Sequence, residues 1–291
     1  MHNVAVELLN TMISKTFEVF HVTDFVDEES TLYHHHDFYE IHCTVEGDAT
    51  FFVEGREFQV SPGTLVLIPP NTLHRIVNQK SIYFERSYFF IHPQFLQSLS
   101  TNQSNLEQCF QQGRIIKIEG TQLSNYLNFF KQLPNNQFGC DLEYQMHFIH
   151  FLILLNRLAI QSNDGIIEMT SPKTDPLIMQ TIDYISNNLN NDLSLKTTAS
   201  KLFTNHYHLS REFKKQTGMT YHTFVIKKRL LYSKELLRIY RNATAVYSLC
   251  GFRSYTHFLR CFKTEFSITP KEFLKRDEAQ QFIQFDHYEN Q

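Results

Sequence analysis

The chain has 291 residues, of which 42% are hydrophobic and 20% charged, with few glycines and prolines. This composition provides enough apolar side chains for folded cores and excludes a largely disordered chain. No transmembrane helix is expected, because the longest apolar run, residues 151–155, is far shorter than the roughly 18 residues that a bilayer span needs. The first ten residues carry no secretory pattern, and the five cysteines form no CxxC pair, so we expect a cytoplasmic protein without a disulfide framework.

Short β-rich runs separated by turn residues follow one another from Thr16 to about Phe90. The runs 50–54, 57–60 and 64–68 are divided by turns that contain glycine or proline. This spacing is typical of antiparallel sandwiches and barrels. The sequence therefore predicts a β-barrel domain over residues 1–105.

A period of three to four residues replaces this pattern after Asn105 and predicts two helices within residues 106–162. The second helix carries apolar residues on nearly all sides from Phe148 to Leu155. Two interpretations stay open: the helix packs on a second copy of the chain, as a dimerisation segment, or it is buried against its own β-domain. The polar residues 163–175 are the predicted linker.

Residues 176–276 are predicted to be helical throughout, with stops at Gly218, Gly251 and Pro270. Charge is distributed unevenly: residues 1–170 contain 9 Lys and Arg against 19 Asp and Glu, whereas residues 171–276 contain 18 against 7. Such a basic module can release counterions from a polyanion, which is usually nucleic acid. The alternative interpretation is that the positive charges form a basic face that contacts only solvent. The tail 277–291 is acidic and aromatic and contains no recognised motif.

The basic half contains an internal repeat with an offset of 49 residues, in which residues 205–214 match residues 254–263. Each copy opens with a residue that can cap a helix, Asn205 or Ser254. Two apolar residues four positions apart are predicted to face inward in each copy: Leu209 with Phe213, and Phe258 with Phe262.

The opposite face of each copy carries an arginine at its centre and a lysine at its end, with aromatic and hydroxyl groups around them. This composition suits a helix in the major groove, where arginine can bind guanine with two hydrogen bonds and lysine can meet phosphate. The candidate DNA-binding residues are His206, Tyr207, Ser210, Arg211 and Lys214 in the first copy, and Arg253, Ser254, Tyr255, Thr256, Leu259, Arg260 and Lys263 in the second.

The basic half resembles the AraC/XylS family of transcription regulators, and the rest of the chain does so more loosely. The family pattern is carried by Ala199, Leu202, Leu209, Arg211, Phe213-Lys214, Gly218-Met219 and Arg229-Leu230, and then by Gly251-Phe252, Phe258, Arg260, Phe262-Lys263, Thr269-Pro270 and Phe273. The resemblance implies two helix-turn-helix units on a connecting helix at about Tyr221 to Tyr240. Phe203, Tyr247 and Ser267 stand where the family usually has small residues. A residue other than glycine at a helix C-cap is costly if its φ is positive, which predicts a distorted second unit that contributes less sequence readout than the first.

The acidic half resembles the cupin superfamily in two histidine-containing motifs. The first comprises His34, His36, Glu40 and Gly47, and the second comprises Gly63, Pro69, Asn71, His74 and Asn78, with Asn71 in place of a glycine. In metal-using cupins the matching residues bind a divalent ion, which makes His34, His36, Glu40 and His74 the candidate ligands. Three imidazoles and a carboxylate suit zinc, iron, nickel or manganese.

Two other interpretations of these residues remain open. In AraC-like regulators the barrel commonly senses a small effector, and by strand parity the pocket wall would contain His36, Glu40, His42, Thr44 and His74. Alternatively, the histidines are satisfied polar groups left in a barrel whose origin was metal binding. No metal or other cofactor is therefore assigned.

The predicted fold class is α+β with two domains: an N-terminal cupin-type β-barrel with a helical pair, and a C-terminal all-α domain with two helix-turn-helix units on a connecting helix. The protein is predicted to be a dimeric transcription regulator without catalytic residues. Activation is the predicted direction, because the family it resembles activates more often than it represses. Its predicted partners are promoter DNA, a small polar effector such as a sugar, and RNA polymerase, with no membrane. Two alternatives remain: a metal-dependent cupin enzyme with an appended basic domain, and a regulator that senses nothing.

Overall fold

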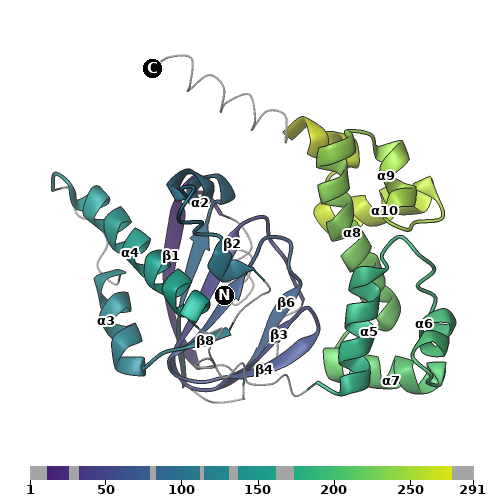
Figure 1. Cartoon of the computed structure of the whole chain (residues 1–291), viewed down its shortest axis with the longest axis horizontal. Helices are drawn as coiled ribbons and strands as arrows, with labels where there is room; N and C mark the ends of the chain where they lie inside the picture. Colours follow the sequence, from purple (N-terminus) through teal and green to yellow (C-terminus); the bar gives the residue numbers. More distant parts are fainter. Residues whose placement is uncertain are drawn as a thin grey trace. The chain divides into compact units, whose positions relative to one another are not determined.

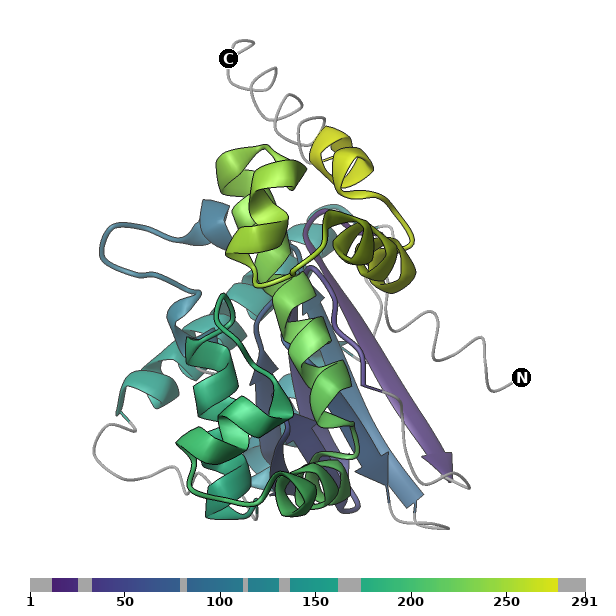
Figure 2. The same ribbon diagram turned by 90° about the vertical axis from the view of Figure 1, so that its right-hand side faces the viewer.

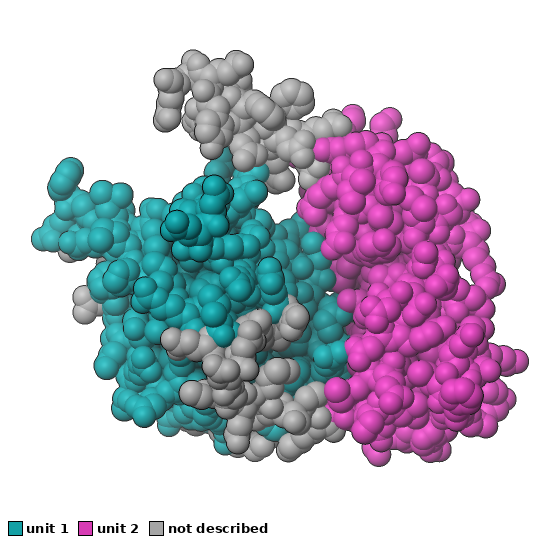
Figure 3. Space-filling model, viewed as in Figure 1, with its two compact units in different colours: residues 1–173 teal, residues 174–291 magenta. Residues whose placement is uncertain are grey.

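The computed structural model describes residues 12–25, 33–78, 83–111, 115–130, 137–161 and 174–276, whose elements are drawn in Figure 1. The chain divides into two compact units, residues 1–173 and 174–291 (Figure 3). The predicted tail 277–291 and all but the last two residues of the predicted linker 163–175 lie outside the described residues. Among the helices of the described ranges, none is long and apolar enough to cross a membrane.

The first unit is built on two antiparallel sheets. Its described strands are β1 (Phe17–Phe25), β2 (Tyr39–Glu46), β3 (Ala49–Val53), β4 (Arg56–Val60), β5 (Thr64–Ile68), β6 (His74–Asn78), β7 (Tyr83–Ile91) and β8 (Ile115–Lys117). They pair in the orders β1-β7-β2-β5-β8 and β4-β3-β6. Apolar side chains from both sheets, led by Phe51, Phe58 and Phe84, form one core between them. The predicted β-domain is therefore confirmed as two facing sheets.

Helices cover the outer face of the larger sheet. These are α2 (Pro93–Leu99), the short η1 (Gln108–Phe110), α3 (Gly120–Phe130) and α4 (Cys140–Gln161). Phe148, Phe151, Leu152 and Leu155 of α4 are fully buried in this core, where the Phe148 ring stacks at 5.7 Å on Phe89 of β7. Burial against its own β-domain thus explains the apolar centre of α4.

Residues 106–162 also contribute a strand that periodicity did not predict. In β8, Ile115 and Ile116 point to opposite faces of the larger sheet, one into each of its two cores. Ile116 pairs with Leu65 of β5 and extends the sheet by one strand. A strand of three residues is too short to give a periodic signal in the sequence.

All the regular elements of the second unit's described residues are helices, as predicted. Its helices are α5 (Pro176–Asn187), α6 (Leu195–Lys201), α7 (His206–Thr217), α8 (Tyr221–Tyr240), α9 (Ala243–Leu249) and α10 (Tyr255–Phe266). The connecting helix α8 has the predicted bounds, and Figure 2 shows it in light green, running lengthwise past the shorter helices. The first pair, α6 and α7, and the second pair, α9 and α10, are called here the first and second helix-turn-helix units.

The predicted stop at Pro270 is instead the start of a further helical stretch, residues 270–276. The backbone N–H of Thr269 donates to the Glu272 carboxylate at 2.7 Å, and the N–H of Glu272 donates to the Thr269 hydroxyl at 3.2 Å. This reciprocal pair is a capping box, and proline is favoured at the first helical position because its missing N–H is not needed there. Helix α10 has already ended at Phe266.

A buried asparagine ties α4 to η1 and to the loop before it. The Asn156 side chain accepts from the backbone N–H of Cys109 at 2.9 Å and donates to the carbonyl of Leu106 at 3.0 Å. Asn156 also donates to the carbonyl of Leu152 on its own helix at 2.9 Å. One amide thus provides hydrogen bonds to two buried backbone groups outside its own helix.

We expect Asn156→Leu to destabilise the first unit by about 2–3 kcal/mol, because the buried N–H of Cys109 and the buried carbonyl of Leu106 would lose the hydrogen bonds that Asn156 provides. Urea unfolding followed by circular dichroism measures this change. Asn128→Leu, on the exposed face of α3, is the matched control and should change the unfolding free energy by no more than about 0.5 kcal/mol. Equal stability of the two variants would contradict the assignment.

Candidate functional site

The repeat in the second unit is a pair of matching helices. Both α7 and α10 have 12 residues, and they begin at positions 206 and 255, which confirms the offset of 49. The Asn205 side chain accepts from the N–H of Tyr207 at 2.8 Å, and the Ser254 hydroxyl accepts from the N–H of His257 at 3.4 Å. Both predicted caps are thus present at the helix starts.

The apolar pairs of both helices are turned inward. Their members, Leu209, Phe213, Phe258 and Phe262, are all 0% exposed. Phe213 packs edge to face on Phe224 at 5.3 Å, and Phe258 does so on Phe252 at 5.3 Å. Because residues on one helix face recur every three to four positions, the opposite faces point to solvent. The prediction on which the DNA-binding surface depends is confirmed.

The candidate DNA-binding residues differ in their exposure. The exposed ones are Tyr207, Arg211, Lys214, Arg253, Ser254, Thr256, Arg260 and Lys263, and the half-buried ones are His206, Ser210, Tyr255 and Leu259. Tyr255 and Leu259 pack partly against the core of the second helix-turn-helix unit. The arginines and lysines are therefore the most available groups on both faces.

Arg211 is held only loosely in the absence of a partner. Its side chain is 72% exposed, its Nε donates to Glu212 at 3.3 Å, and its guanidinium lies 3.4 Å from the imidazole of His208. Exposed ion pairs of this kind contribute about 1 kcal/mol or less, so the guanidinium can exchange Glu212 for a base edge. His208 was absent from the predicted set, although it lies one helical turn before Arg211.

Two of the departures from the family pattern have strained backbones, and one of them, Ser267, is the helix C-cap where the cost is predicted. Phe203 and Ser267 both have left-handed backbones, with φ of 52° and 59°. Each such residue costs about 1–2 kcal/mol compared with the right-handed conformation. Tyr247 is accommodated by an edge-to-face contact with Tyr255 at 5.6 Å. The second helix-turn-helix unit nevertheless keeps a recognition helix as long as that of the first.

The first unit gathers its motif histidines around one buried carboxylate. Nε2 of His36 lies 2.7 Å from Oε2 of Glu40, and Nε2 of His74 lies 3.3 Å from the same oxygen. His34 pairs with His74 through two backbone hydrogen bonds of 3.0 Å. Asn71 adopts the positive φ, 60°, that the missing glycine of the motif would supply, and its N–H donates to the carbonyl of His36.

Protonation in this cluster follows from its hydrogen bonds. Nδ1 of His36 lies 2.8 Å from the carbonyl of Phe38, which can only accept, so Nδ1 carries a proton. Nε2 of His36 and Oε2 of Glu40 are only 2.7 Å apart, so one further proton must lie between them as a hydrogen bond. Burial raises the pKa of Glu40, but the imidazoles of His36 and His74 outweigh it and hold that pKa well below its usual range.

The donor set fits a divalent metal ion. Ligand atoms of His34, Glu40 and His74 lie within 4.8 Å of one another. Nδ1 of His36 and Nδ1 of His74 each contact a backbone carbonyl, of Phe38 and of Thr72, which leaves both Nε2 atoms turned toward Glu40. Metal-binding histidines are usually oriented by such second hydrogen bonds. The structure thus brings all four predicted ligand residues together.

A second polar group lies deeper between the sheets. His42 is fully buried against Phe51 and Tyr88, and both of its ring nitrogens, like the hydroxyl of Thr44, lack a hydrogen-bond partner among the described residues. Burial lowers the pKa of His42 to about 3, so the imidazole is neutral and offers one donor and one acceptor. Buried polar atoms without partners are costly, which makes this a site where a ligand would be stabilising.

Two side chains of this interior were missing from the predicted set. Arg86 and Tyr88 on β7 lie opposite Thr44 and His42 on β2, and Nε of Arg86 donates to the hydroxyl of Tyr88 at 2.7 Å. Both are buried. The alternation of residues along β7 was a usable signal, because every second residue from Phe84 onward points to the same side of the sheet.

Comparison with known proteins covers both units. A family model described as the AraC-like ligand binding domain matches residues 24–152, and a model described as a helix-turn-helix domain matches residues 198–276. The HTH-type transcriptional activator RhaS of Escherichia coli (strain SMS-3-5 / SECEC) is 23% identical over 245 residues, which cover 82% of this chain and 86% of RhaS.

Among solved structures, the chain is similar to wild-type ToxT from Vibrio cholerae strain SCE256, bound to an unsaturated fatty acid. The identity is 16% and the TM-score 0.40, over 91% of this chain and 96% of that one. The C-terminal domain of AraT from Geobacillus stearothermophilus has 22% identity and a TM-score of 0.35, covering 36% of this chain and 88% of that one. The two family models match in the order in which the two units occur. With its N-terminal sensor domain and its two helix-turn-helix units, the chain belongs to the AraC/XylS family of transcription regulators.

Proposed function

We propose that this regulator binds promoter DNA through α7 and α10 and responds to a small polar effector held between the sheets of its first unit. The observation that carries the DNA-binding part is the burial of the apolar pairs in both helices, which leaves Arg211 and Arg260 exposed on matching faces. Activation is the proposed direction, supported by the similarity to RhaS, which is named an activator. This role implies that RNA polymerase is a partner and that the protein is located in the cytoplasm.

The relatives do not support the alternative of a metal-dependent enzyme. One matched model describes a ligand-binding domain and the other a DNA-binding domain, and RhaS is a regulator. The histidines of the first unit are therefore assigned to binding and not to catalysis.

A homodimer is part of the proposal, and the outer face of α4 supports it. Leu142 and Met146 are 59% and 64% exposed, and Ile160 near the helix end is also exposed. The inner face of α4 already packs on its own sheet, so these apolar side chains are available to a second copy of the chain.

The interior of the first unit supports a ligand with hydroxyl groups, such as a sugar. The neutral imidazole of His42 offers one donor and one acceptor, and the buried hydroxyl of Thr44 offers both. A hydroxyl can donate and accept at once, and would therefore match both side chains. A site built for such groups would discriminate strongly against analogues that lack them.

We expect Arg211→Ala and Arg260→Ala each to weaken binding to the native operator by about 1–3 kcal/mol, with little effect on unrelated DNA, because each removes a contact to a base edge. Lys263→Ala should weaken binding to all sequences and reduce its dependence on salt, because it removes a phosphate contact. Footprinting on the DNA upstream of the protein's own gene identifies the operator, and fluorescence anisotropy then measures the affinities.

The exposed Lys271, beyond α10, provides a matched control, since Lys271→Ala removes one positive charge outside both recognition faces. Operator binding by Arg211→Ala that equals binding by the unaltered protein would refute the placement of α7 in the major groove.

Replacing His42 should separate stability from ligand response. His42→Leu removes two buried nitrogens that have no partner among the described residues and keeps a similar side-chain volume, so we expect the first unit to gain about 1–2 kcal/mol of stability. The variant should no longer be stabilised by the effector that stabilises the unaltered protein, and thermal shift assays with a panel of sugars and polar metabolites measure this. Loss of stability, or an unchanged response to the effector, would contradict a ligand-binding role for His42.

A divalent metal ion is a further part of the proposal, held by His34, Glu40 and His74 with support from His36. Such an ion would replace the shared proton as the partner of the Glu40 carboxylate. We expect purified protein to contain close to one zinc, iron or manganese ion per chain, and Glu40→Gln to lose it. Glu46→Gln, at the exposed end of the same strand, should retain the ion. Metal analysis that finds no ion in freshly purified, chelator-free protein would leave the histidines to the effector alone.

A further inference from the structure

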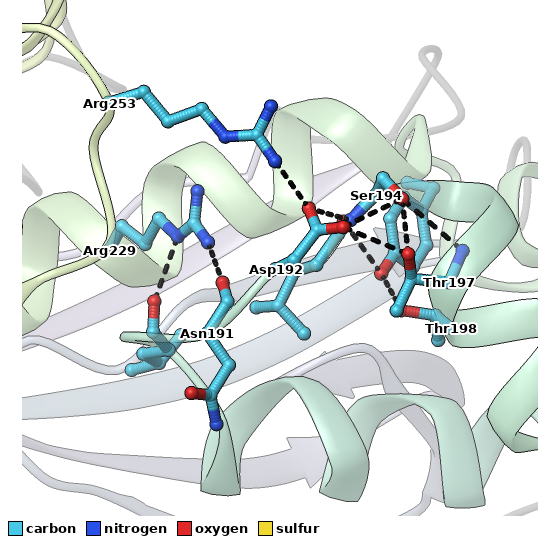
Figure 4. Close-up of polar contacts among 10 residues, drawn as sticks. Asn191, Asp192, Ser194, Thr197, Thr198, Arg229 and Arg253 are labelled. Carbon is cyan, nitrogen blue, oxygen red and sulfur yellow. Dashed lines mark hydrogen bonds and ion pairs between the residues drawn. The ribbon is translucent and has the colours of Figure 1, made fainter.

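Two loops of the second unit, one just before the first helix-turn-helix unit and one within the second, lie against each other beside α8. The first, residues 188–194, joins α5 to α6, and the second, residues 250–254, joins α9 to α10. Figure 4 shows the side chains between them, with Arg229 and Arg253 both directed at the first loop. The first loop leads into α6, which packs on the recognition helix α7, and the second loop leads directly into the recognition helix α10.

Arg229 fixes the first loop to the connecting helix. Its Nε donates to the carbonyl of Leu189 at 2.9 Å, and its terminal nitrogen donates to the carbonyl of Asn191 at 2.7 Å. One planar guanidinium thus satisfies two carbonyls of a turn, which a lysine, with a single ammonium group, cannot reproduce in this geometry. The residue belongs to the family pattern, but the pattern alone does not reveal its partners.

Gly251 brings the second loop into direct contact with the same place. Its φ is 84°, and a Cβ atom at this position would overlap the carbonyl oxygen of Leu189 and lie 2.7 Å from Nε of Arg229. Only glycine allows so close an approach. The backbone of the second helix-turn-helix unit therefore packs directly on the carbonyl that Arg229 binds.

An ion pair joins the two loops a second time. Arg253 donates to Oδ1 of Asp192 at 2.9 Å. The carboxylate is already oriented by the Thr197 hydroxyl at 2.9 Å and the N–H of Ser194 at 3.2 Å, so little freedom remains to be lost when Arg253 binds. Hydrogen bonding from Thr197, with smaller contributions from Ser194 and Arg253, holds the pKa of Asp192 below its usual range.

The ion pair alone is a weak link. The side chains of Arg253 and Asp192 are 85% and 48% exposed, and exposed pairs contribute about 1 kcal/mol or less. Its effect depends on Arg229 and Gly251, which hold the loops at the distance where the pair can form. The three contacts thus act on one junction.

We propose that Arg229, Gly251 and the pair of Asp192 with Arg253 form a clamp that fixes the two recognition helices relative to each other, so that Arg253 is a positioning residue and not a DNA contact. This inference rests on the proposed function. Two recognition helices that enter successive major grooves must match a separation of about 34 Å, and any freedom between them is lost on binding. The clamp removes that freedom before DNA binds. The connecting helix α8 alone would leave the two loops beside it free to move relative to each other.

Three duplexes test the clamp with the full chain: the footprinted operator, the operator with one half-site scrambled, and the operator with one base pair inserted between the half-sites. Arg229→Lys keeps the positive charge but cannot bridge both carbonyls. We expect about 5- to 20-fold weaker binding to the intact operator, binding to the single half-site within about 2-fold of the unaltered protein, and a smaller penalty for the inserted base pair. Arg276→Lys, at the exposed end of the described chain, is the control and should change none of these.

Exchange of the two charges tests the role of Arg253. Asp192→Arg and Arg253→Asp should each lower affinity for the intact operator, and the double variant should restore it to within about 2-fold, because the pair forms again in reverse. Failure of the double variant to recover would overturn the assignment of Arg253 as a positioning residue. An equal loss on the single half-site and on the intact operator in Arg229→Lys would overturn the clamp.

Hydrogen exchange without DNA distinguishes failure of the clamp from failure of the proposed function. In Arg229→Lys the amides of residues 188–194 and 250–254 should exchange faster together, while α7 and α10 keep their protection. Unchanged exchange in both loops would overturn the clamp. An unaltered protein that protects no DNA would instead refute the proposed function, and the exchange measurement would still decide whether the clamp exists.

Discussion

The burial of two aromatic side chains, Phe213 and Phe262, at equivalent positions of two helices determines the orientation of everything else in the second unit. Each lies one turn after another buried residue, and together they leave only one face of each helix for solvent. Removing either ring from its core would cost several kcal/mol, so the helices cannot rotate about their axes. The outward direction of the arginines is therefore a consequence of core packing, and the caps at Asn205 and Ser254 fix where each helix begins.

The first unit meets the opposite constraint, because it must keep charged and polar groups inside an apolar sandwich. Glu40 is tolerated there because His36 and His74 offset the cost of burying its charge. His42 has no such compensation from the described residues. An interior that served stability alone would replace this imidazole with an apolar side chain, so its presence is best understood through a ligand that completes its hydrogen bonds.

Local chemistry explains which features could be predicted from the sequence. The caps and the inward-facing pairs depend on residues within a few positions of one another. The offset comes from matching two copies of one segment, and the bounds of α8 come from the resemblance to the family. The convergence of His34, His36, Glu40 and His74 was available only through the motif spacing, since His34 and His74 meet by a bridge between distant segments. What could not be predicted depends on pairing between remote segments: β8 is placed by β5, and Arg86 is placed opposite Thr44 by the register of β7 with β2.

The contacts of Arg229 show the same limit at a smaller scale. Nothing in the sequence around this arginine indicates that its guanidinium binds two carbonyls 38 and 40 residues earlier. Their need for a donor arises only once the turn at Leu189 and Asn191 has formed and left those carbonyls without a helical partner.

The two units thus use unsatisfied polar groups in contrasting ways. In the second unit, backbone groups of a loop are satisfied by the protein itself, which makes the DNA-binding surface rigid, whereas in the described part of the first unit His42 and Thr44 are left for a ligand to satisfy. Rigidity where a fixed spacing must be matched, and incomplete hydrogen bonding where a signal must be received, is the division of roles that a ligand-responsive regulator requires.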